Sequence, residues 1–404
     1  MENRELIMSK LTTFTFVAAM TVLPMTKTLA AESLSETFAA STQSSELEIG
    51  YTDLDDFLAL TVLDVGRSNR EKAPRPSGNT GTRMKKRINR LTALEGNRVY
   101  FDNFDNAKYV EALYAIQESL EALPQEVSLS QFNSNEQLAY WLNLYNFTLL
   151  KEIAQNYPKV DIGKEFSKEK KSDFFNDDVL NIEGKSLSLN DIKYDIVLNK
   201  YKGREEVIYG FFGGVIGAPS IQTHAFRGKD IWRQLEKAAA DFVNSNRGTY
   251  YEGRISVLYD RYSDFFDGNQ EAVKDHLLSY LDDEVYSDIA NTPAEDLEMD
   301  IKDFSAATIG DDRVYAAGVS FNNAALIDSA RVEQRGGDIA GPIATQNFLA
   351  EGMITKAKLN VRFTADELEL LQGINKQYQV TNGQVTIKDL KEKEATGKES
   401  KDEN

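Results

Sequence analysis

The sequence contains no cysteine and only two histidines, His224 and His276, among its 404 residues. The lack of cysteine excludes disulfides, thiolate zinc sites, iron–sulfur clusters and thiol nucleophiles. Two histidines provide very little material for a His-rich metal centre or a conventional Ser-His-Asp triad. His276 lies at the edge of an apolar face, a position typical of a packed core histidine. We therefore predict that the protein uses no metal and no other cofactor.

An excess of positive charge is also lacking, since 46 Lys and Arg stand against 64 Asp and Glu, for a net charge of −18. Nucleic acids and anionic lipid surfaces are bound through an excess of Lys and Arg, so this balance argues against both as partners. Solubility is the simplest explanation of the acidity. Apolar residues make up 41% and charged residues 27%, which is close to the composition of globular proteins.

An apolar run from Leu11 to Met25 follows Lys10 near the N-terminus. It is shorter than the ~20 residues of a membrane-spanning helix, and Thr28-Leu29-Ala30 places small residues where a signal peptidase cleaves. We predict a signal peptide over residues 1–30, a periplasmic or secreted location and no membrane span. The Ser-, Thr- and Glu-rich residues 31–50 are predicted to form a disordered leader.

Apolar residues at helical spacing predict helices near residues 54–65, 109–120, 134–156, 188–198, 231–242 and 273–281. The helix over 134–156 has the clearest pattern, with Ser134 and Gln137 as a capping box at its start. Trp141 lies on its apolar stripe, so we expect Trp141 in the core.

Aromatic and β-branched residues predict strands at 207–216 and 255–259, with a possible third strand at 314–321. The predicted fold class is therefore α+β, a helix-rich single domain around a small β-sheet. We place this domain at residues 51–326. Residues 327–404 are predicted to form a largely flexible C-terminal extension, which ends in a charged, partly disordered tail.

Three stretches resemble the domain-of-unknown-function family 547. They are the helix 136–146 with a Trp, an Asn and a Tyr-Asn pair, the Gly- and Pro-containing segment 208–220, and residues 242–248 followed by Tyr259 and 262–266. Segments around Gly66, Gly81 and Gly96 resemble the lead-in of an exported bacterial branch of the family. Because the family's activity is unassigned, the resemblance implies a fold and a compartment more than a mechanism.

Many members of this family have a His-Phe pair in the second stretch and a Ser-Cys-Pro in the loop that follows. Here Ile208-Tyr209 and Gly217-Ala218-Pro219 stand at those places. Whatever an imidazole or a thiol does in those relatives, this chain does not do it with these residues.

Four polar residues of the helix over 134–156, namely Glu136, Tyr140, Asn143 and Asn146, are spaced to share one face. One hypothesis is a hydrolase or transferase in which Glu136 is the acid/base and the other three position the substrate. The alternative is structural, because buried Asn side chains also hold neighbouring loops by hydrogen bonds to backbone.

Residues 66–98 carry a basic cluster inside this acidic chain. Ten Lys and Arg stand against Glu71 and Glu95, for a local net charge of +8. Arginines in this segment suit an anionic small molecule, glycan or peptide, because guanidinium groups form paired hydrogen bonds with carboxylate and phosphate. We single out Arg67, Arg70, Arg83 and Arg98 as candidate ligand-binding residues. In the alternative, they pair with the protein's own carboxylates and anchor a long loop.

Two functions thus stay open. The leading hypothesis is a binding or accessory domain of the cell envelope that recognises an anionic ligand, and the competing one is the enzyme that uses Glu136. Geometry separates them, because an acid/base needs Glu136 in an open pocket, whereas a structural role buries it.

Overall fold

The computed structural model describes residues 33–74, 89–282, 284–309, 343–358, 361–364, 367–368 and 371. Within these residues the protein is helix-rich, with small sheets of two or three strands, which confirms the predicted α+β class. The predicted signal peptide, Arg83, the possible strand at 314–321 and the charged tail lie outside the described residues.

Two long helices, α3 (Ala107–Glu126) and α4 (Ser134–Asn156), pack against each other, and α4 is buried along most of its length. Trp141 is 0% exposed, so its predicted place in the core is confirmed. The helix over 134–156 is confirmed as well, but its N-cap is Asn133 rather than Ser134. The Asn133 Oδ1 accepts the N–H of Glu136 at 2.9 Å.

The helices predicted near 231–242 and 273–281 are also confirmed. The helix predicted over 188–198 is a π-helix, Asp191–Leu198, and α10 was not predicted. The other α-helices are α1 (Leu34–Thr37), α2 (Thr52–Thr61), α5 (Ile162–Ser167), α6 (Asp173–Asn176), α7 (Ile231–Val243), α8 (Leu258–Arg261), α9 (Gln270–Tyr280), α10 (Val285–Asn291) and α12 (Ile343–Lys356). Short 3₁₀ helices occupy Phe101–Asp105, Leu129–Gln131, Glu169–Lys171, Glu205–Gly210, Gly228–Asp230, Ser263–Phe266 and Ala294–Asp296.

In the placed part of the chain the strands are short and form three separate sheets. β1 (Val62–Leu63) pairs antiparallel with β2 (Arg98–Val99), and β3 (Leu180–Ile182) forms a hairpin with β4 (Lys185–Leu187). In the third sheet, β6 (Arg254–Ser256) lies between β5 (Thr249–Tyr250), to which it is antiparallel, and β7 (Glu298–Ile301), to which it is parallel. The strand predicted at 255–259 is therefore present only in its first part, because α8 begins at Leu258.

The prediction of a strand at 207–216 is wrong. Glu205–Gly210 is a 3₁₀ helix, and only Val215 makes an isolated bridge, to Ala306. Its apolar side chains are buried on every side, so an unbroken apolar run does not distinguish a strand from a buried irregular segment. Asn146 supplies the hydrogen bonds that a neighbouring strand would make, pairing with Gly210 O and Phe212 N, each at 2.8 Å.

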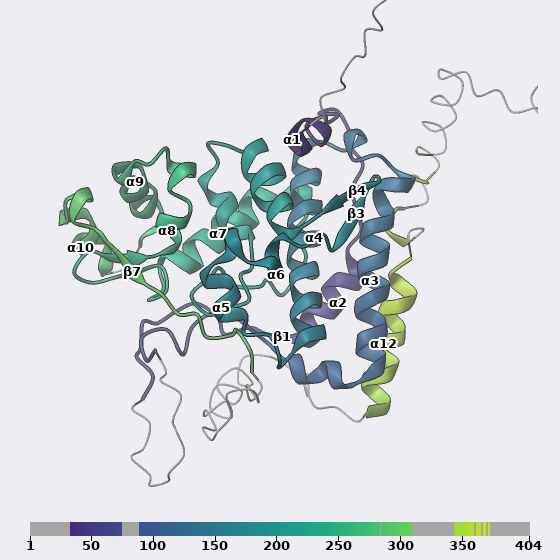
Figure 1. The fold of residues 1–404 in the computed structure, drawn as a ribbon, viewed down its shortest axis with the longest axis horizontal. Coiled ribbons are helices and arrows are strands. Elements are labelled where there is room, and N and C mark those ends of the chain that lie inside the picture. The colour runs from purple at the N-terminus through teal and green to yellow at the C-terminus, as the bar shows by residue number, and fades with distance from the viewer. Residues whose placement is uncertain are drawn as a thin grey trace, which may run out of the picture. The chain divides into compact units, whose positions relative to one another are not determined.

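The predicted leader and C-terminal extension both need correction within the described residues. In residues 33–50, which follow the predicted cleavage site, Phe38, Leu47 and Ile49 are buried, and the Phe38 ring meets Trp141 edge-on at 5.0 Å. In the extension, α12 lies alongside α3 (Figure 1). A few apolar residues in each segment reach the core, although their overall composition is typical of disordered sequence.

Candidate functional site

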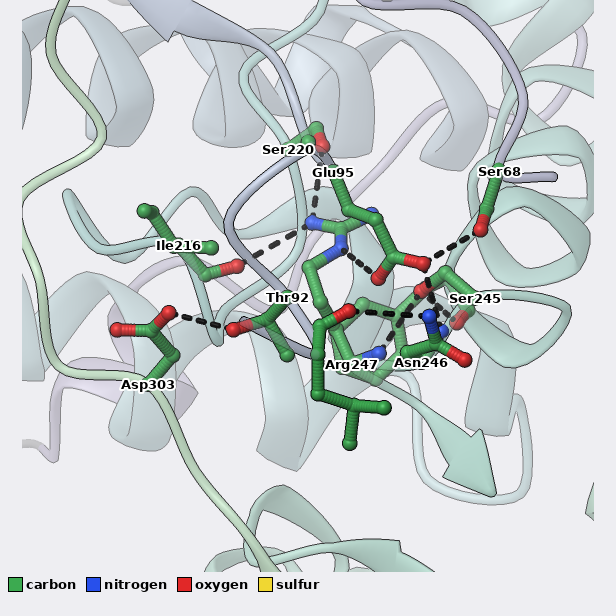
Figure 2. Close-up of polar contacts among 12 residues, drawn as sticks. Ser68, Thr92, Glu95, Ile216, Ser220, Ser245, Asn246, Arg247 and Asp303 are labelled. Carbon is green, nitrogen blue, oxygen red and sulfur yellow. Dashed lines mark hydrogen bonds and ion pairs between the residues drawn. The ribbon is translucent and has the colours of Figure 1, made fainter. Parts of the chain in front are cut away.

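A buried group of polar residues joins four separate parts of the chain (Figure 2). Its members come from the basic segment, the loop over 213–220, the turn after α7 and the strand-like stretch after β7. We call it the Glu95–Arg247 cluster, and it consists of Ser68, Thr92, Glu95, Arg98, Ser220, Ser245, Asn246, Arg247 and Asp303.

Glu95 lies at the centre of this cluster. Its Oε1 accepts hydrogen bonds from the Ser68 hydroxyl at 2.5 Å and from the Asn246 N–H at 3.0 Å. Its Oε2 lies 3.9 Å from Arg247 Nε, which is an ion pair but too long for a hydrogen bond. Figure 2 shows the carboxylate between these three partners. Ser68 and Asn246 therefore hold Glu95 slightly apart from the guanidinium.

Arg247 ties the loop over 213–220 to the turn after α7. Its Nη1 donates to Ala218 O at 3.0 Å, to the Ser220 hydroxyl at 3.1 Å and to Ile216 O at 3.4 Å. Burial lowers the pKa of Arg247, and the nearby Glu95 carboxylate opposes that shift. Gly96 must be glycine here, because its φ is +74° and a Cβ would come within 2.6 Å of Arg247 Nη1.

Three buried polar atoms of the cluster have no hydrogen-bond partner in the part of the chain that the structure describes. They are Glu95 Oε2, Arg247 Nε and Asn246 Oδ1. Two of these atoms are acceptors and one is a donor.

Arg98 and Asp303 complete the cluster. Arg98 donates to Gly96 O at 2.6 Å and Ala93 O at 3.2 Å. Burial lowers its pKa to about 10, and the positive charge of Arg247 adds to this shift. Asp303 accepts the Thr92 hydroxyl at 2.5 Å. The cluster therefore holds two arginines and two carboxylates, so its charges balance.

The candidate ligand-binding arginines are held in different ways. Arg67 is on the surface, with its side chain 55% exposed and paired to Asp282 at 2.6 Å. Arg70 is half-buried and donates to Thr249 O at 2.7 Å and to the Thr249 hydroxyl at 3.1 Å. Arg98 is in the cluster, and Arg83 lies outside the described residues.

The candidate catalytic residue Glu136 is in the first turn of α4 and is 3% exposed. Its Oε1 accepts the N–H of Ile49 at 2.9 Å, and its Oε2 accepts the N–H of Gly228 at 3.1 Å. Burial raises the pKa of Glu136 to about 7, although these two hydrogen bonds act in the opposite direction. Both carboxylate oxygens thus hold backbone segments in place.

The other three residues of this helix face also bond to backbone groups. Asn143 pairs with both the O and the N–H of Phe226, at 2.9 and 2.8 Å, as Asn146 does with Gly210 and Phe212. The Tyr140 hydroxyl donates to Leu120 O at 3.1 Å. That carbonyl lacks its usual helical donor, because Pro124 has no N–H. We call Glu136, Tyr140, Asn143 and Asn146 the α4 polar face.

Ile208 and Ala218 stand where the family resemblance places a His and a Cys, and no solvent reaches either side chain. An imidazole reaches the neighbouring Tyr209 from elsewhere, because His276 stacks on that ring at 5.7 Å and its Nε2 lies 2.9 Å from the Tyr209 hydroxyl. Burial lowers the pKa of His276 to about 4.

Sequence reasoning named Arg98 but missed Glu95, Arg247 and Asp303 as members of one cluster. Arg247 and Glu95 each lie in a stretch that resembles the family, which was the available signal. In the described residues, no group of three or more His, Asp or Glu is placed to hold a metal ion. None of the described helices is both long and apolar enough to span a membrane.

The fold and these contacts define a helix-rich α+β domain in which buried polar side chains hold distant segments together. Residues 129–243 match the family described as "Protein of unknown function, DUF547", which confirms the resemblance over those residues. No curated protein and no solved structure matches the chain. The match contains the whole α4 polar face, but of the Glu95–Arg247 cluster it contains only Ser220.

Proposed function

We propose that the chain is an exported binding or accessory domain of the cell envelope that recognises an anionic ligand through its basic segment, residues 66–98. The family match indicates an uncharacterised domain and leaves this function to be tested.

Support comes from how the two ends of the basic segment are held. Ser68 and Glu95 meet in the cluster, and further along, Ala73 and Arg90 are joined by two hydrogen bonds, Ala73 N to Arg90 O at 2.8 Å and Arg90 Nε to Ala73 O at 2.6 Å. Fixed ends reduce the ordering cost of binding. Between them, residues 75–88 contain five Lys and Arg and no acidic residue.

The described contacts divide the candidate arginines by role. Arg70 and Arg98 donate to backbone carbonyls and anchor the segment. Contact with the ligand then falls to Arg67 and Arg83, together with the basic run Lys85-Lys86-Arg87. The ligand is an anionic small molecule, glycan or peptide.

The competing enzyme has one observation in its favour, because a pKa of about 7 suits Glu136 for acid–base catalysis. Its geometry favours the binding function instead. A general acid must reach the proton that it transfers, whereas Glu136 is buried with both oxygens bonded to backbone N–H groups.

Binding to heparin, used as an anionic glycan probe, tests this proposal. Replacing Lys85, Lys86 and Arg87 together with alanine is expected to weaken binding about tenfold or more, which corresponds to about 1.4 kcal/mol. We expect the wild-type affinity to fall as salt is raised, because salt screens exposed charges.

A control variant removes the same charge elsewhere, by replacing Lys164, Lys168 and Lys171 with alanine. These lysines are exposed, so their loss leaves the fold intact. The control is expected to bind heparin about as well as the wild type does. Equal weakening in both variants would mean that net charge, rather than the basic segment, determines binding.

Export predicts a mature protein that begins at Ala31. The small residues of Thr28-Leu29-Ala30 after the apolar run are the reason. Mass spectrometry of the N-terminal peptide from the envelope fraction measures this directly. An intact Met1 terminus in that fraction would contradict the export part of the proposal.

A further inference from the structure

The C-terminal segment 343–371, of which the structure describes residues 343–358, 361–364, 367–368 and 371, packs against α2 and α3. Among its described side chains, Ala350, Met353, Ala357, Phe363 and Leu371 belong to the core. Lys356 Nζ lies 2.6 Å from Asp56 Oδ2, but this pair is at the surface and contributes little. The firm attachment comes from residues that follow the helix.

Arg362 is the centre of that attachment. Its Nη2 lies 2.6 Å from Asp53 Oδ2, and its Nη1 lies 3.3 Å from Asp53 Oδ1 and 2.9 Å from Gly50 O. Its Nε donates to the Ser119 hydroxyl at 2.7 Å. The side chains of Arg362 and Asp53 are each 1% exposed. All three guanidinium nitrogens are thus bound by a carboxylate, a hydroxyl and a carbonyl, the planar geometry that arginine suits best.

The site also contacts the backbone of Arg362 and the side chain of Phe363. Gly50 N donates to Arg362 O at 2.7 Å, and a Cβ on Gly50 would come within 2.9 Å of that oxygen. The Phe363 ring stacks on Phe132 with centroids 6.3 Å apart. The site therefore recognises an arginine followed by an aromatic residue, through both side chains and the backbone.

The stretch next to the site is rich in acidic residues, of which Asp55 pairs with Arg227 and Glu48 with Lys229 of the main domain. Residues 48–56 carry Glu48, Asp53, Asp55 and Asp56 and no basic residue. Asp53 lies in the first turn of α2, where the helix dipole stabilises a negative charge when no cation is bound. Burial raises the pKa of Asp53 and the Arg362 guanidinium opposes this shift, so the carboxylate depends on the cation that it pairs with.

We propose that Gly50, Asp53, Ser119 and Phe132 form a binding site for an arginine-aromatic peptide, which the chain's own segment 343–371 occupies in cis. The occupant is held by its core residues and by one buried guanidinium, and residues 310–342 separate it from Ile309 in the sequence. It is a ligand of the domain that can be exchanged. The site is distinct from the basic segment and takes a partner of the opposite charge.

Exchange in a cut chain tests this. A protease site is inserted after Gly337, and the full chain is cut. The C-terminal fragment is expected to stay bound to the main domain when the protein is at micromolar concentration. An excess of a labelled synthetic peptide of residues 343–371 is then expected to replace it. Loss of the cooperative unfolding transition on cutting, or failure of the labelled peptide to enter, would overturn the proposal.

Variants of the labelled peptide test what is recognised while the main domain stays unchanged. Arg362→Ala is expected to bind about 100-fold more weakly, because it removes a buried, fully paired charge. Arg362→Lys is expected to be about tenfold weaker, since an ammonium does not pair with both carboxylate oxygens in a plane. Lys356→Ala, the matched control, is expected to bind within about threefold of the wild type. Equal binding of all four peptides would show that the site does not recognise arginine.

Discussion

Replacing Arg247 with alanine is expected to lower the free energy of unfolding by about 3–5 kcal/mol. The substitution removes the guanidinium that forms the ion pair with the buried Glu95 carboxylate, and leaves Ala218 O and the Ser220 hydroxyl without their donor. Urea denaturation followed by circular dichroism measures the change.

Two further variants separate this effect from a general loss of side-chain volume. Arg254→Ala removes a surface arginine paired to Asp300 and is expected to cost about 0–1 kcal/mol. In a Glu95→Gln background, Arg247→Ala is expected to cost less than it does alone, because no unpaired carboxylate remains. Additive costs for Glu95→Gln and Arg247→Ala would contradict a coupled cluster.

Replacing Trp141 with alanine is expected to cost about 3–5 kcal/mol, as removal of a large buried aromatic does. The indole packs edge-on against Phe38 at 5.0 Å and against Tyr140 at 5.2 Å. Its loss therefore removes one of the contacts between α4 and the residues that follow the predicted cleavage site. Urea denaturation again gives the change, and a cost below about 1 kcal/mol would place Trp141 outside the core.

Trp141→Phe tests whether this contribution is packing or hydrogen bonding. The Trp141 Nε1 has no hydrogen-bond partner among the described residues. Phenylalanine keeps a ring in the core, so we expect a cost of about 1–2 kcal/mol. A cost equal to that of alanine would show that the indole N–H matters more than the ring.

Helices were the part of the fold that the sequence predicted well. In α4, α7 and α9 the apolar residues recur at the helical period, so local pattern and tertiary burial agree. The prediction of a strand over 207–216 failed because this segment is buried and takes its hydrogen bonds from Asn146. Asn146 is remote in sequence, so a local pattern does not reveal it. The prediction of a disordered leader failed over residues 33–50, because a few buried apolar residues outweigh a polar composition.

The candidate site was likewise predictable only where it follows a local sequence pattern. The four residues of the α4 polar face follow from helical spacing, but their partners, such as Ile49 and Phe226, are remote in sequence. The pairing of Glu95 with Arg247 joins two segments with no common local pattern. A single sequence shows which polar residues share a helix face, and it does not show what each one meets.

In this structure Glu136 is a buried link between two backbone amides rather than an acid/base open to solvent. Burial raises the pKa of Glu136 from 4.5 to about 7, with Glu48 and Glu367 adding to the shift. Between these two pH values the folded state binds more protons than the unfolded state, so the shift lowers stability as pH rises. The size of this loss is on the order of 3 kcal/mol.

Urea denaturation of the wild type and of Glu136→Gln between pH 4.5 and pH 8 tests this claim most directly. His276 has the opposite effect, since its lowered pKa makes stability fall as pH drops from 6.5 to about 4, but both proteins carry it and it cancels in the difference. We predict that the stability of Glu136→Gln relative to the wild type increases by on the order of 3 kcal/mol as pH rises from 4.5 to 7.5. A difference that stays constant over this range would show that Glu136 ionises as it does in water, and would contradict the buried link.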